Sequence, residues 1–173
     1  MADGPGVVVR DATEADLPAI LAVYNDVIAT STAIWREEPV TLEDRTAWFA
    51  AQHAEGFPVL VATVGDDVAG FASFGHFRHH PGYHPTVEHS IHVAAGHRGR
   101  GVGTALLDAI VARARALGRS VVVGGIDGAN EASIRLHERA GFREVARMPG
   151  IGRKHGEVLD LVLLQLDLDP PPA

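Results

Sequence analysis

The chain has 173 residues, of which 46% are hydrophobic, and carries a net charge of −7 at neutral pH. A negatively charged protein repels a polyphosphate backbone, so we do not expect it to bind nucleic acid. It contains no cysteine, which excludes disulfides, thiolate metal ligands and a cysteine nucleophile. Residues 1–9 lack the features of a signal peptide, and no stretch approaches the roughly 20 apolar residues that span a bilayer. We therefore expect a cytoplasmic protein that does not enter membranes.

This length suits one domain with a substantial core. We expect that domain to span residues 1–168, because no linker or internal repeat interrupts it. Residues 169–173 are rich in proline, which cannot donate to a strand ladder, and we expect them to be frayed.

The first half of the chain predicts a strand, two helices and a hairpin. Residues 7–10 form a short apolar strand, and Thr13 and Thr41 each precede a run with apolar residues at helical spacing. Apolar runs at 59–64 and 68–74 flank a Gly-Asp-Asp turn, a pattern typical of a β-hairpin.

The second half alternates strands with helices. The expected elements are, in order, a loop at 76–85, a strand at 87–93, a helix from 102 to 117, a buried strand at 120–123, a helix from Asn130 to Gly141, and strands at 143–148 and 158–166. This order predicts an α/β (α+β) fold of three layers, in which a central mixed sheet, mostly antiparallel, lies between helices.

A carboxylate interrupts the predicted strand at 87–93. Alternate side chains of a strand point to opposite faces. One face carries Val87, His89, Ile91 and Val93, and the other carries Glu88, Ser90 and His92. Glutamate is uncommon in the middle of a strand. Glu88 is therefore either a functional group or half of a structural ion pair, and we favour the functional interpretation.

A glycine-rich turn follows this strand and begins the next helix. It consists of Arg98-Gly99-Arg100-Gly101-Val102-Gly103, followed by Thr104. Glycines let the backbone approach a ligand, and N–H groups at a helix start bind anions with the help of the helix dipole. The arginines add donors suited to phosphate. The alternatives are a plain tight turn, a P-loop, which fails because no Gly-Lys-Ser/Thr follows, and a dinucleotide-binding turn, which fits poorly so deep in the chain.

The turn matches the Q/R-x-x-G-x-G/A signature of the GNAT superfamily of N-acetyltransferases. The similarity extends to Asn130 and to Leu136-His137-Glu138-Arg139-Ala140-Gly141-Phe142, which resembles the closing helix motif of that superfamily. Within it, the chain resembles the branch that acetylates phosphinothricin, methionine sulfoximine and methionine sulfone. The matching segments are Tyr24-Asn25-Asp26, Thr32-Ala33-Ile34-Trp35, Phe71-Ala72-Ser73-Phe74-Gly75, Gly82-Tyr83, Thr86-Val87-Glu88-His89-Ser90 and Gly152-Arg153-Lys154-His155-Gly156. The resemblance implies the GNAT-type fold, acetyl-CoA as co-substrate, a small-molecule amine as acceptor, and a homodimer.

The resemblance also assigns roles in the reaction. Glu88 would be the general base that removes a proton from the attacking amine, and His137 would protonate the departing CoA thiolate. Backbone amides at Ile91, His92 and Val93 would orient the pantetheine arm and polarise the thioester carbonyl. The CoA pyrophosphate would lie on the glycine-rich turn.

Asn130 and Ser133 share a helix face with His137, and this face would hold the pantetheine arm. The alternative is a helix N-cap, a solvated serine and a half-buried histidine.

The acceptor side depends on loop residues. Arg78 would bind the carboxylate of an amino acid through its guanidinium. The remaining acceptor contacts are expected from Thr32, Trp35, Phe77, Tyr83, Ser90, Lys154 and His155. Lys154 and His155 would reach the acceptor either within the chain or across a dimer interface. The alternatives are a solvated loop arginine, a core tryptophan and an ordinary surface hairpin.

Seven histidines lie between residues 76 and 97, at His76, His79, His80, His84, His89, His92 and His97. The adjacent pair His79-His80 is not a recognised ligand spacing and carboxylates are sparse nearby, so we expect no metal site. The histidines of the loop would face solvent or tune the charge of the acceptor pocket. Two other functions stay open. One is acetylation of a different amine, such as a peptide N-terminus, a polyamine or an aminoglycoside, and the other is a non-catalytic acyl-CoA-binding module.

Overall fold

The computed structural model describes residues 6–168. Its strands are β1 (Val7–Asp11), β2 (Val59–Val64), β3 (Asp67–His76), β4 (Thr86–Val93), β5 (Val121–Asp127), β6 (Arg143–Lys154) and β7 (Glu157–Asp167). Its α-helices are α1 (Leu17–Thr30), α2 (Leu42–Ala54), α3 (Val102–Ala116) and α4 (Glu131–Arg139). The tail at 169–173, which we expect to be frayed, lies outside the described residues.

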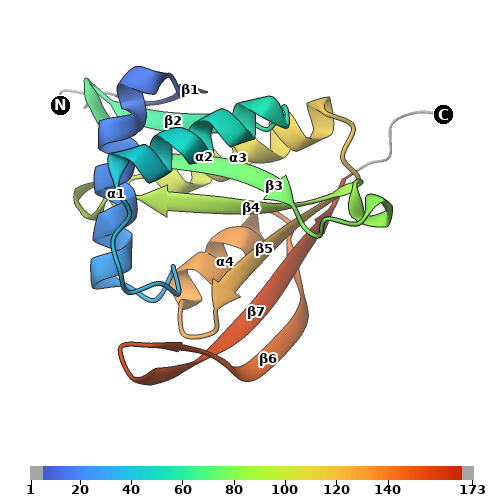
Figure 1. The fold of residues 1–173 in the computed structure, drawn as a ribbon. Coiled ribbons are helices and arrows are strands. Elements are labelled where there is room, and N and C mark those ends of the chain that lie inside the picture. The colour runs from blue at the N-terminus through green and yellow to red at the C-terminus, as the bar shows by residue number, and fades with distance from the viewer. Residues whose placement is uncertain (1–5, 169–173) are drawn as a thin grey trace.

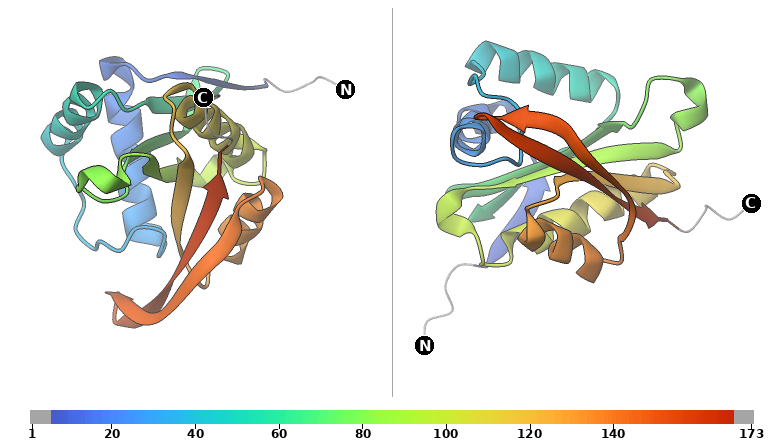
Figure 2. Two further views of the ribbon diagram at one scale, coloured as in Figure 1. Left: turned by 90° about the vertical axis from the view of Figure 1, so that its right-hand side faces the viewer. Right: turned by 90° about the horizontal axis from the view of Figure 1, so that it is seen from below.

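The strands form one sheet in the order β1-β2-β3-β4-β5-β7-β6, and among the described strands only β4 and β5 pair in parallel. Helices α1 and α2 cover one face of the sheet, and α3 and α4 cover the other (Figure 1; Figure 2, right). The predicted three-layer fold with a mixed, mostly antiparallel sheet is therefore confirmed. Within residues 6–168, no helix is both long and apolar enough to cross a bilayer.

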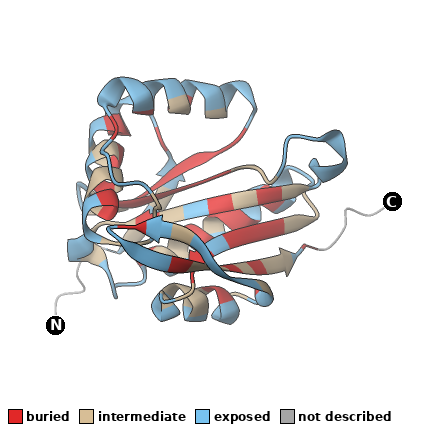
Figure 3. Cartoon of the chain, turned by 60° about the horizontal axis from the view of Figure 1, so that its bottom comes forward, coloured by how far each residue is buried: buried red, intermediate tan, exposed pale blue. Residues whose placement is uncertain are grey.

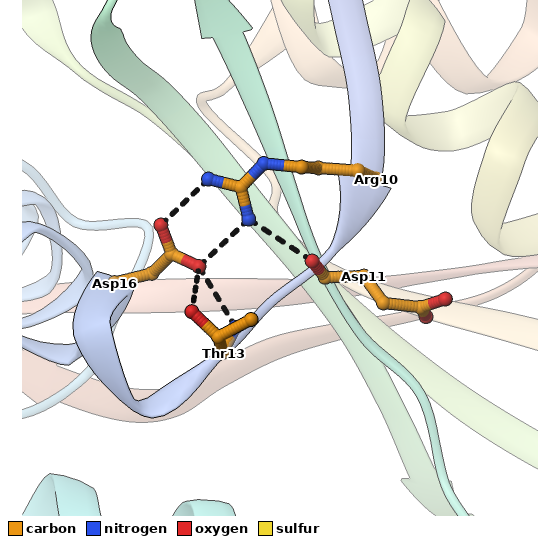
Figure 4. A network of polar contacts seen from close by, with 4 residues as sticks. All are labelled: Arg10, Asp11, Thr13 and Asp16. Carbon is orange, nitrogen blue, oxygen red and sulfur yellow. Dashed lines mark hydrogen bonds and ion pairs between the residues drawn. The ribbon is translucent and has the colours of Figure 1, made fainter.

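Both helices on the first face follow a threonine–aspartate capping pair. The Thr41 hydroxyl accepts from the Asp44 N–H, and the Asp44 carboxylate accepts from the Thr41 N–H. Before α1, Thr13 and Asp16 make the same kind of pair around a short 3-10 turn. Arg10 adds two N–H donors to the Asp16 carboxylate, each at 2.8 Å (Figure 4). These contacts, with Arg10 first, hold the pKa of Asp16 down to about 2.

The two faces of the sheet carry separate apolar clusters. The larger lies under α3, where Leu106 and Ile110 are fully buried one helical turn apart, and the smaller joins Ile20, Phe49 and Phe71 under α1 and α2. Figure 3 shows the buried residues running along the strands, while the outer side of α2 is exposed. This packing holds the central strands rigidly in place, which fixes the position of any group they carry.

Three strands run clearly further than their patterns predict. β3 continues to His76, β5 continues past Val123 to Asp127, and β6 continues past Met148 to Lys154. Pro149 and Gly150 predict the end of a strand, but they produce only an irregularity between Met148 and Gly152, after which pairing with β7 resumes. The result is a long outer hairpin, β6–β7, whose tip lies beside the end of α1 (Figure 2, right).

The sheet opens between its two parallel strands. The pairing of β4 with β5 ends at His89 and Gly124, although β4 runs on to Val93 and β5 to Asp127. On their other sides, β3 pairs with β4 as far as Val93 and β7 pairs with β5 as far as Asp127. The inner edges of both strand ends therefore lack a ladder partner in the described sheet. They offer backbone N–H and C=O groups to a ligand.

Candidate active site

A cleft of about 900 Å³ lies between these separated strand ends. It is surrounded by β4, β5, the turn before α3, the start of α4, and the end of α1 with its following loop. Its lining includes Ser90–Val93, Gly124–Asp127, Arg98, Gly99, Gly101, Gly103, Thr104, Asn130, Ser133, His137 and Thr30–Ala33. A volume of this size is typical of small-ligand sites.

The turn before α3 gives one end of the cleft the features of an anion site. Gly99 and Gly101 have φ angles of +73° and +82°, which favour glycine, and a Cβ at either would meet nothing within 4 Å. Gly101 is the N-cap of α3, so the first N–H groups of this 15-residue helix have no intrahelical partner. Together with the helix dipole and Arg98, they provide donors for a phosphate.

Two other residues of the turn are placed differently from the prediction. The side chain of Val102 is 1% exposed and packs in the larger apolar cluster, so only its backbone can serve the turn. Arg100 is exposed and lies outside the lining of the cleft. The glycines, Arg98 and the helix start therefore carry the anion site.

Strand β4 forms one wall, with the predicted alternation of faces. Ile91 and Val93 pack towards the α3 cluster, whereas the His92 ring lies against Tyr24 and Phe71 on the opposite face. Burial, and then the charge of Arg45, lower the pKa of His92 to about 4. The unpaired inner edge of this stretch suits an amide-containing arm.

A buried pair of histidines lies at the closed end of the cleft. The rings of His89 and His137 stack, with centroids 5.0 Å apart and Nε2 atoms 3.1 Å apart. His137 Nδ1 lies 2.7 Å from the Ser133 carbonyl oxygen, which can only accept. Nδ1 of His137 therefore carries the hydrogen, and its Nε2 accepts from His89. Burial lowers the pKa of both rings, to about 3 for His89, so the resting pair is neutral.

Helix α4 presents the other two predicted contacts to the cleft. Asn130 is the N-cap of α4, and its Oδ1 accepts from the Ser133 N–H at 3.1 Å. The capping interpretation of Asn130 is therefore correct. Both residues also line the cleft, and the Asn130 amide nitrogen is left as a donor.

Glu88 lies on the opposite face of β4 from the histidine pair. A Cβ at Gly125 would lie 3.1 Å from Glu88 Oε1, whereas a Cβ at Gly124 would lie 2.9 Å from His89 Nε2 and 3.3 Å from His137 Nε2. Two adjacent glycines of β5 thus leave room for a carboxylate on one face and for imidazoles on the other. Glu88 is half-buried, and burial raises the pKa of its carboxyl while the charge of Arg78 lowers it. A carboxylate with a raised pKa is a better proton acceptor near neutral pH.

The loop after β3 places three predicted acceptor contacts beside Glu88. Gly75 pairs with Glu88 in the ladder, so the chain that follows runs past the Glu88 face. The Arg78 guanidinium lies 4.2 Å from the centroid of the Phe77 ring, and Phe77 meets Tyr83 at 6.0 Å. Arg78 and Tyr83 are exposed. They form a rim outside the lining of the cleft.

Asp127 is a functional candidate that sequence reasoning missed. It ends β5, is 5% exposed and lines the cleft. The Thr32 hydroxyl donates to Asp127 Oδ2, and the Ala129 N–H donates to its Oδ1 at 3.1 Å. His89 was missed as well, because it fell among apolar residues on its strand face. A carboxylate directly after a buried strand was the available signal for Asp127.

The prediction that Lys154 contacts the substrate is wrong. Its ammonium is 1% exposed and donates to three backbone carbonyls, those of Ile28, Ser31 and Ile34, at 2.6, 2.6 and 2.8 Å. An ammonium has three N–H donors, so none is left for a substrate. These contacts lie within the chain.

Trp35 and His155 also lie where the β6–β7 hairpin contacts the loop after α1. Ring atoms of Trp35 occupy the space beside Gly152, where a Cβ would clash with the indole. Trp35 is thus a packed aromatic, and it lies outside the lining of the cleft. The backbone N–H of His155 donates to Glu37 Oε1 at 2.6 Å, while its side chain is exposed. Within residues 6–168, no three His, Cys, Asp or Glu residues are arranged to hold a metal ion.

Comparison with known proteins gives consistent matches. Residues 20–142 match the acetyltransferase (GNAT) family. The chain is 50% identical over 163 residues to the L-methionine sulfoximine/L-methionine sulfone acetyltransferase of Pseudomonas paraeruginosa, which covers 94% of this chain and 95% of that protein. It is 34% identical over 158 residues to the phosphinothricin N-acetyltransferase of Streptomyces coelicolor, with 90% and 92% covered. The crystal structure of a GNAT superfamily phosphinothricin acetyltransferase from Sinorhizobium meliloti in complex with acetyl-CoA superposes with a TM-score of 0.91 at 33% identity, covering 95% of this chain and 93% of that one.

Proposed function

Because this chain belongs to the GNAT acetyltransferase family, we propose that it moves an acetyl group from acetyl-CoA to the α-amine of a small amino-acid analogue. The acceptor is of the methionine sulfoximine, methionine sulfone or phosphinothricin type, as in its relatives. The observation that carries the proposal is the open junction of β4 and β5, which runs from the glycine-rich turn to the point where the two strands join. Glu88 is outside the lining of the cleft but lies one residue before that point, on the other face of β4.

The cleft fits acetyl-CoA along its length. The glycine turn and Arg98 would hold the pyrophosphate, since free N–H groups converge there at a helix start. The unpaired edge of β4, with Asn130 and Ser133 opposite, would hold the pantetheine arm and bring the thioester to the point where the strands meet. Backbone N–H groups of β4 at this point would stabilise the oxyanion that forms at the thioester carbonyl.

Glu88 is the proposed general base. The acceptor nitrogen attacks the thioester carbon, the carbon–sulfur bond breaks, and the proton lost by the amine passes to the Glu88 carboxylate directly or through one water. Burial of Glu88 supports this role because it raises the pKa of the carboxyl. The reaction needs no acyl-enzyme, in keeping with a chain that has no cysteine.

His137 is the proposed proton donor to the CoA thiolate. Its resting form holds a hydrogen on Nδ1 and a lone pair on Nε2, so Nε2 must first take up a proton from a solvent water that reaches the cleft, and that proton then passes to the thiolate sulfur. A thiolate forming in the cleft would favour that step, because nearby negative charge stabilises an imidazolium that burial otherwise disfavours. On the other face, Arg78 would bind the acceptor carboxylate, with Tyr83, Ser90 and Thr32 around it.

The test is a thiol-release assay with acetyl-CoA against methionine sulfone, methionine sulfoximine, phosphinothricin and several cationic amines. We expect turnover with the amino-acid analogues and little with polyamines or aminoglycosides. Preference for a cationic amine would assign a different acceptor, and acetyl-CoA binding without transfer to any amine would indicate a binding module. Glu88→Gln should lower kcat by about 10²- to 10⁴-fold while acetyl-CoA affinity is kept. Full activity in Glu88→Gln would remove Glu88 as the base.

We also propose that the enzyme is a homodimer and acts in the cytoplasm, where acetyl-CoA is available. Strand β6 is an edge of the sheet, and the β6–β7 hairpin exposes Val145, Met148, Ile151 and Val158. An edge strand with exposed apolar side chains favours pairing with a second copy. Analytical ultracentrifugation of the wild type and of Ile151→Glu tests the dimer, and a monomeric wild type would contradict it.

A further inference from the structure

Lys154 is the only lysine in the sequence, and the other 14 members of the Lys and Arg set are arginines. It is also among the most buried large side chains of the described protein, at 1% exposed. All other residues of the Lys and Arg set are arginines, and the one lysine is buried. This suggests that the site accepts the shape of an ammonium and not that of a guanidinium.

The groups around Lys154 match the geometry of an ammonium. Its Nζ donates to the carbonyl oxygens of Ile28, Ser31 and Ile34 within 2.8 Å. Three convergent acceptors match the three N–H groups of a tetrahedral ammonium, whereas a guanidinium is planar, larger and forked. Burial lowers the pKa of this ammonium and the charge of Glu37 raises it. The carbonyls come from the C-terminal end of α1 and the loop after it, where a positive charge also stabilises the helix dipole.

The segment that Lys154 holds is a wall of the cleft. Ser31, Thr32 and Ala33 all line it. Thr32 carries its hydroxyl across to the buried Asp127 at the end of β5. The position of this loop therefore sets the width of the cleft on the side where the two strands end.

The tip of the β6–β7 hairpin contacts the same loop at two further points. The Trp35 ring packs against Gly152 on β6, and the His155 N–H donates to Glu37 Oε1. Of the three contacts, however, the lysine contact is the one that bonds three carbonyls at once, one at the end of α1 and two in the loop. Residues more than 120 positions apart in the sequence are thus tied at one buried atom.

We propose that Lys154 is a positioning residue for the acceptor: by fixing the loop at 31–35 it holds Thr32 against Asp127 and so shapes the part of the cleft that receives the amine substrate. This inference rests on the proposed function, and it deepens that function by assigning acceptor selection to a residue that does not touch the acceptor. Lys154 bonds neither the glycine-rich turn nor the edge of β4. Acetyl-CoA binding should therefore not depend on Lys154.

The kinetic test compares Lys154→Met with Arg153→Met, a matched control that removes the adjacent, exposed cation of the same hairpin. We expect Lys154→Met to raise the KM for methionine sulfone about tenfold or more, since the loop is no longer held and Thr32 shifts from the position in which it shapes the acceptor site. The KM for acetyl-CoA should change less than about twofold. Arg153→Met should match the wild type in both. Thr32→Val should reproduce the acceptor effect with a smaller loss of thermal stability. An unchanged acceptor KM in Lys154→Met would reduce Lys154 to a merely structural contact and overturn the proposal.

A second measurement does not depend on turnover. Because the sequence has one lysine, Lys154 carries its one side-chain amine, and an amine-reactive acylating reagent reports on that residue, with the α-amino group of the purified protein as internal reference. We expect Lys154 to be strongly protected in the wild type, more protected with methionine sulfone bound, and modified faster in Thr32→Val. Equal modification rates at Lys154 in wild type and Thr32→Val would refute the coupling between Lys154 and the cleft. Suppose that no amino-acid analogue is acetylated but that Lys154 is modified faster in Thr32→Val, as expected. The proposed acceptor would then be wrong, while the proposal that Lys154 holds the loop at 31–35 would be supported.

Discussion

Replacing His92 with phenylalanine should make the fold less sensitive to acid. His92 is 9% exposed and packs between Tyr24 and Phe71, with ring centroids 5.6 Å and 5.1 Å away. Burial, and secondarily the charge of Arg45, lower its pKa from 6.5 to about 4. The imidazole is therefore neutral in the folded protein at pH values where it is charged in the unfolded chain.

The size of the effect follows from proton linkage. A histidine whose pKa is lowered by folding contributes stability above its unfolded pKa and loses it as the pH falls towards the folded pKa. Between the two values of His92, the free energy of unfolding falls by about 1.4 kcal/mol for each pH unit. Between about pH 6.5 and about pH 4.5 this amounts to roughly 2.5 kcal/mol, a large share of the stability of a typical domain. Phenylalanine keeps the aromatic contacts and does not titrate.

The assay is urea unfolding of wild type and His92→Phe at several pH values in this range. The wild-type free energy of unfolding should decline more steeply with acidification, and the difference between the two proteins should change by roughly 2.5 kcal/mol across the range. Phe71→Leu is the control, because it removes packing from the same cluster but keeps the titrating ring. It should cost about 1 kcal/mol with little dependence on pH. If His92→Phe loses stability with acid as steeply as the wild type, the burial argument for His92 is refuted.

Two further changes test local features. Asp16→Asn should cost about 2 kcal/mol near neutral pH, because the Asp16 pKa is held at about 2 by Arg10. The cost should shrink as the pH falls below about 4 and vanish only below the folded pKa, where the carboxyl is protonated in both the folded and the unfolded protein. A pH-independent difference in urea unfolding would contradict the linkage. Gly101→Ala should lower stability by about 1–2 kcal/mol, since φ is +82° there, and should raise the KM for acetyl-CoA. Gly96→Ala, where a Cβ meets nothing within 4 Å and φ is not positive, is its control in the same thermal melts and kinetics, and an equal response of the two variants would argue against a special turn.

The fold was predictable where its signals are local. Threonine caps, apolar spacing and the hairpin turn each depend on neighbours a few residues apart, so the existence of most helices and strands followed from the sequence. The end of β6 did not, because Pro149 and Gly150 predict a strand end locally, while pairing with β7 overrides them. Strand length is decided by the partner strand as well as by the segment itself.

The site was predictable only in part for the same reason. The turn at 98–104 contains its own donors and helix start, so its shape could be predicted from neighbouring residues. That it holds the CoA pyrophosphate was implied by the family resemblance and stays a prediction. The roles of Glu88 and His137 stay predictions, and only the structure shows that they lie on opposite faces of β4. No local pattern could reveal that Thr32 meets Asp127.

The sequence by itself determined the glycine turn, the alternating faces of β4 and the family resemblance, because each is written in residues adjacent along the chain. Tertiary structure alone decided where β4 and β5 part, which residues line the resulting cleft, and what Lys154 does. Its ammonium meets carbonyls 120 or more residues away, and a contact of that kind exists only once hairpin and helix have packed together. A lysine expected at the substrate instead bonds the wall of the cleft, because burial and three convergent carbonyls occupy all of its N–H donors.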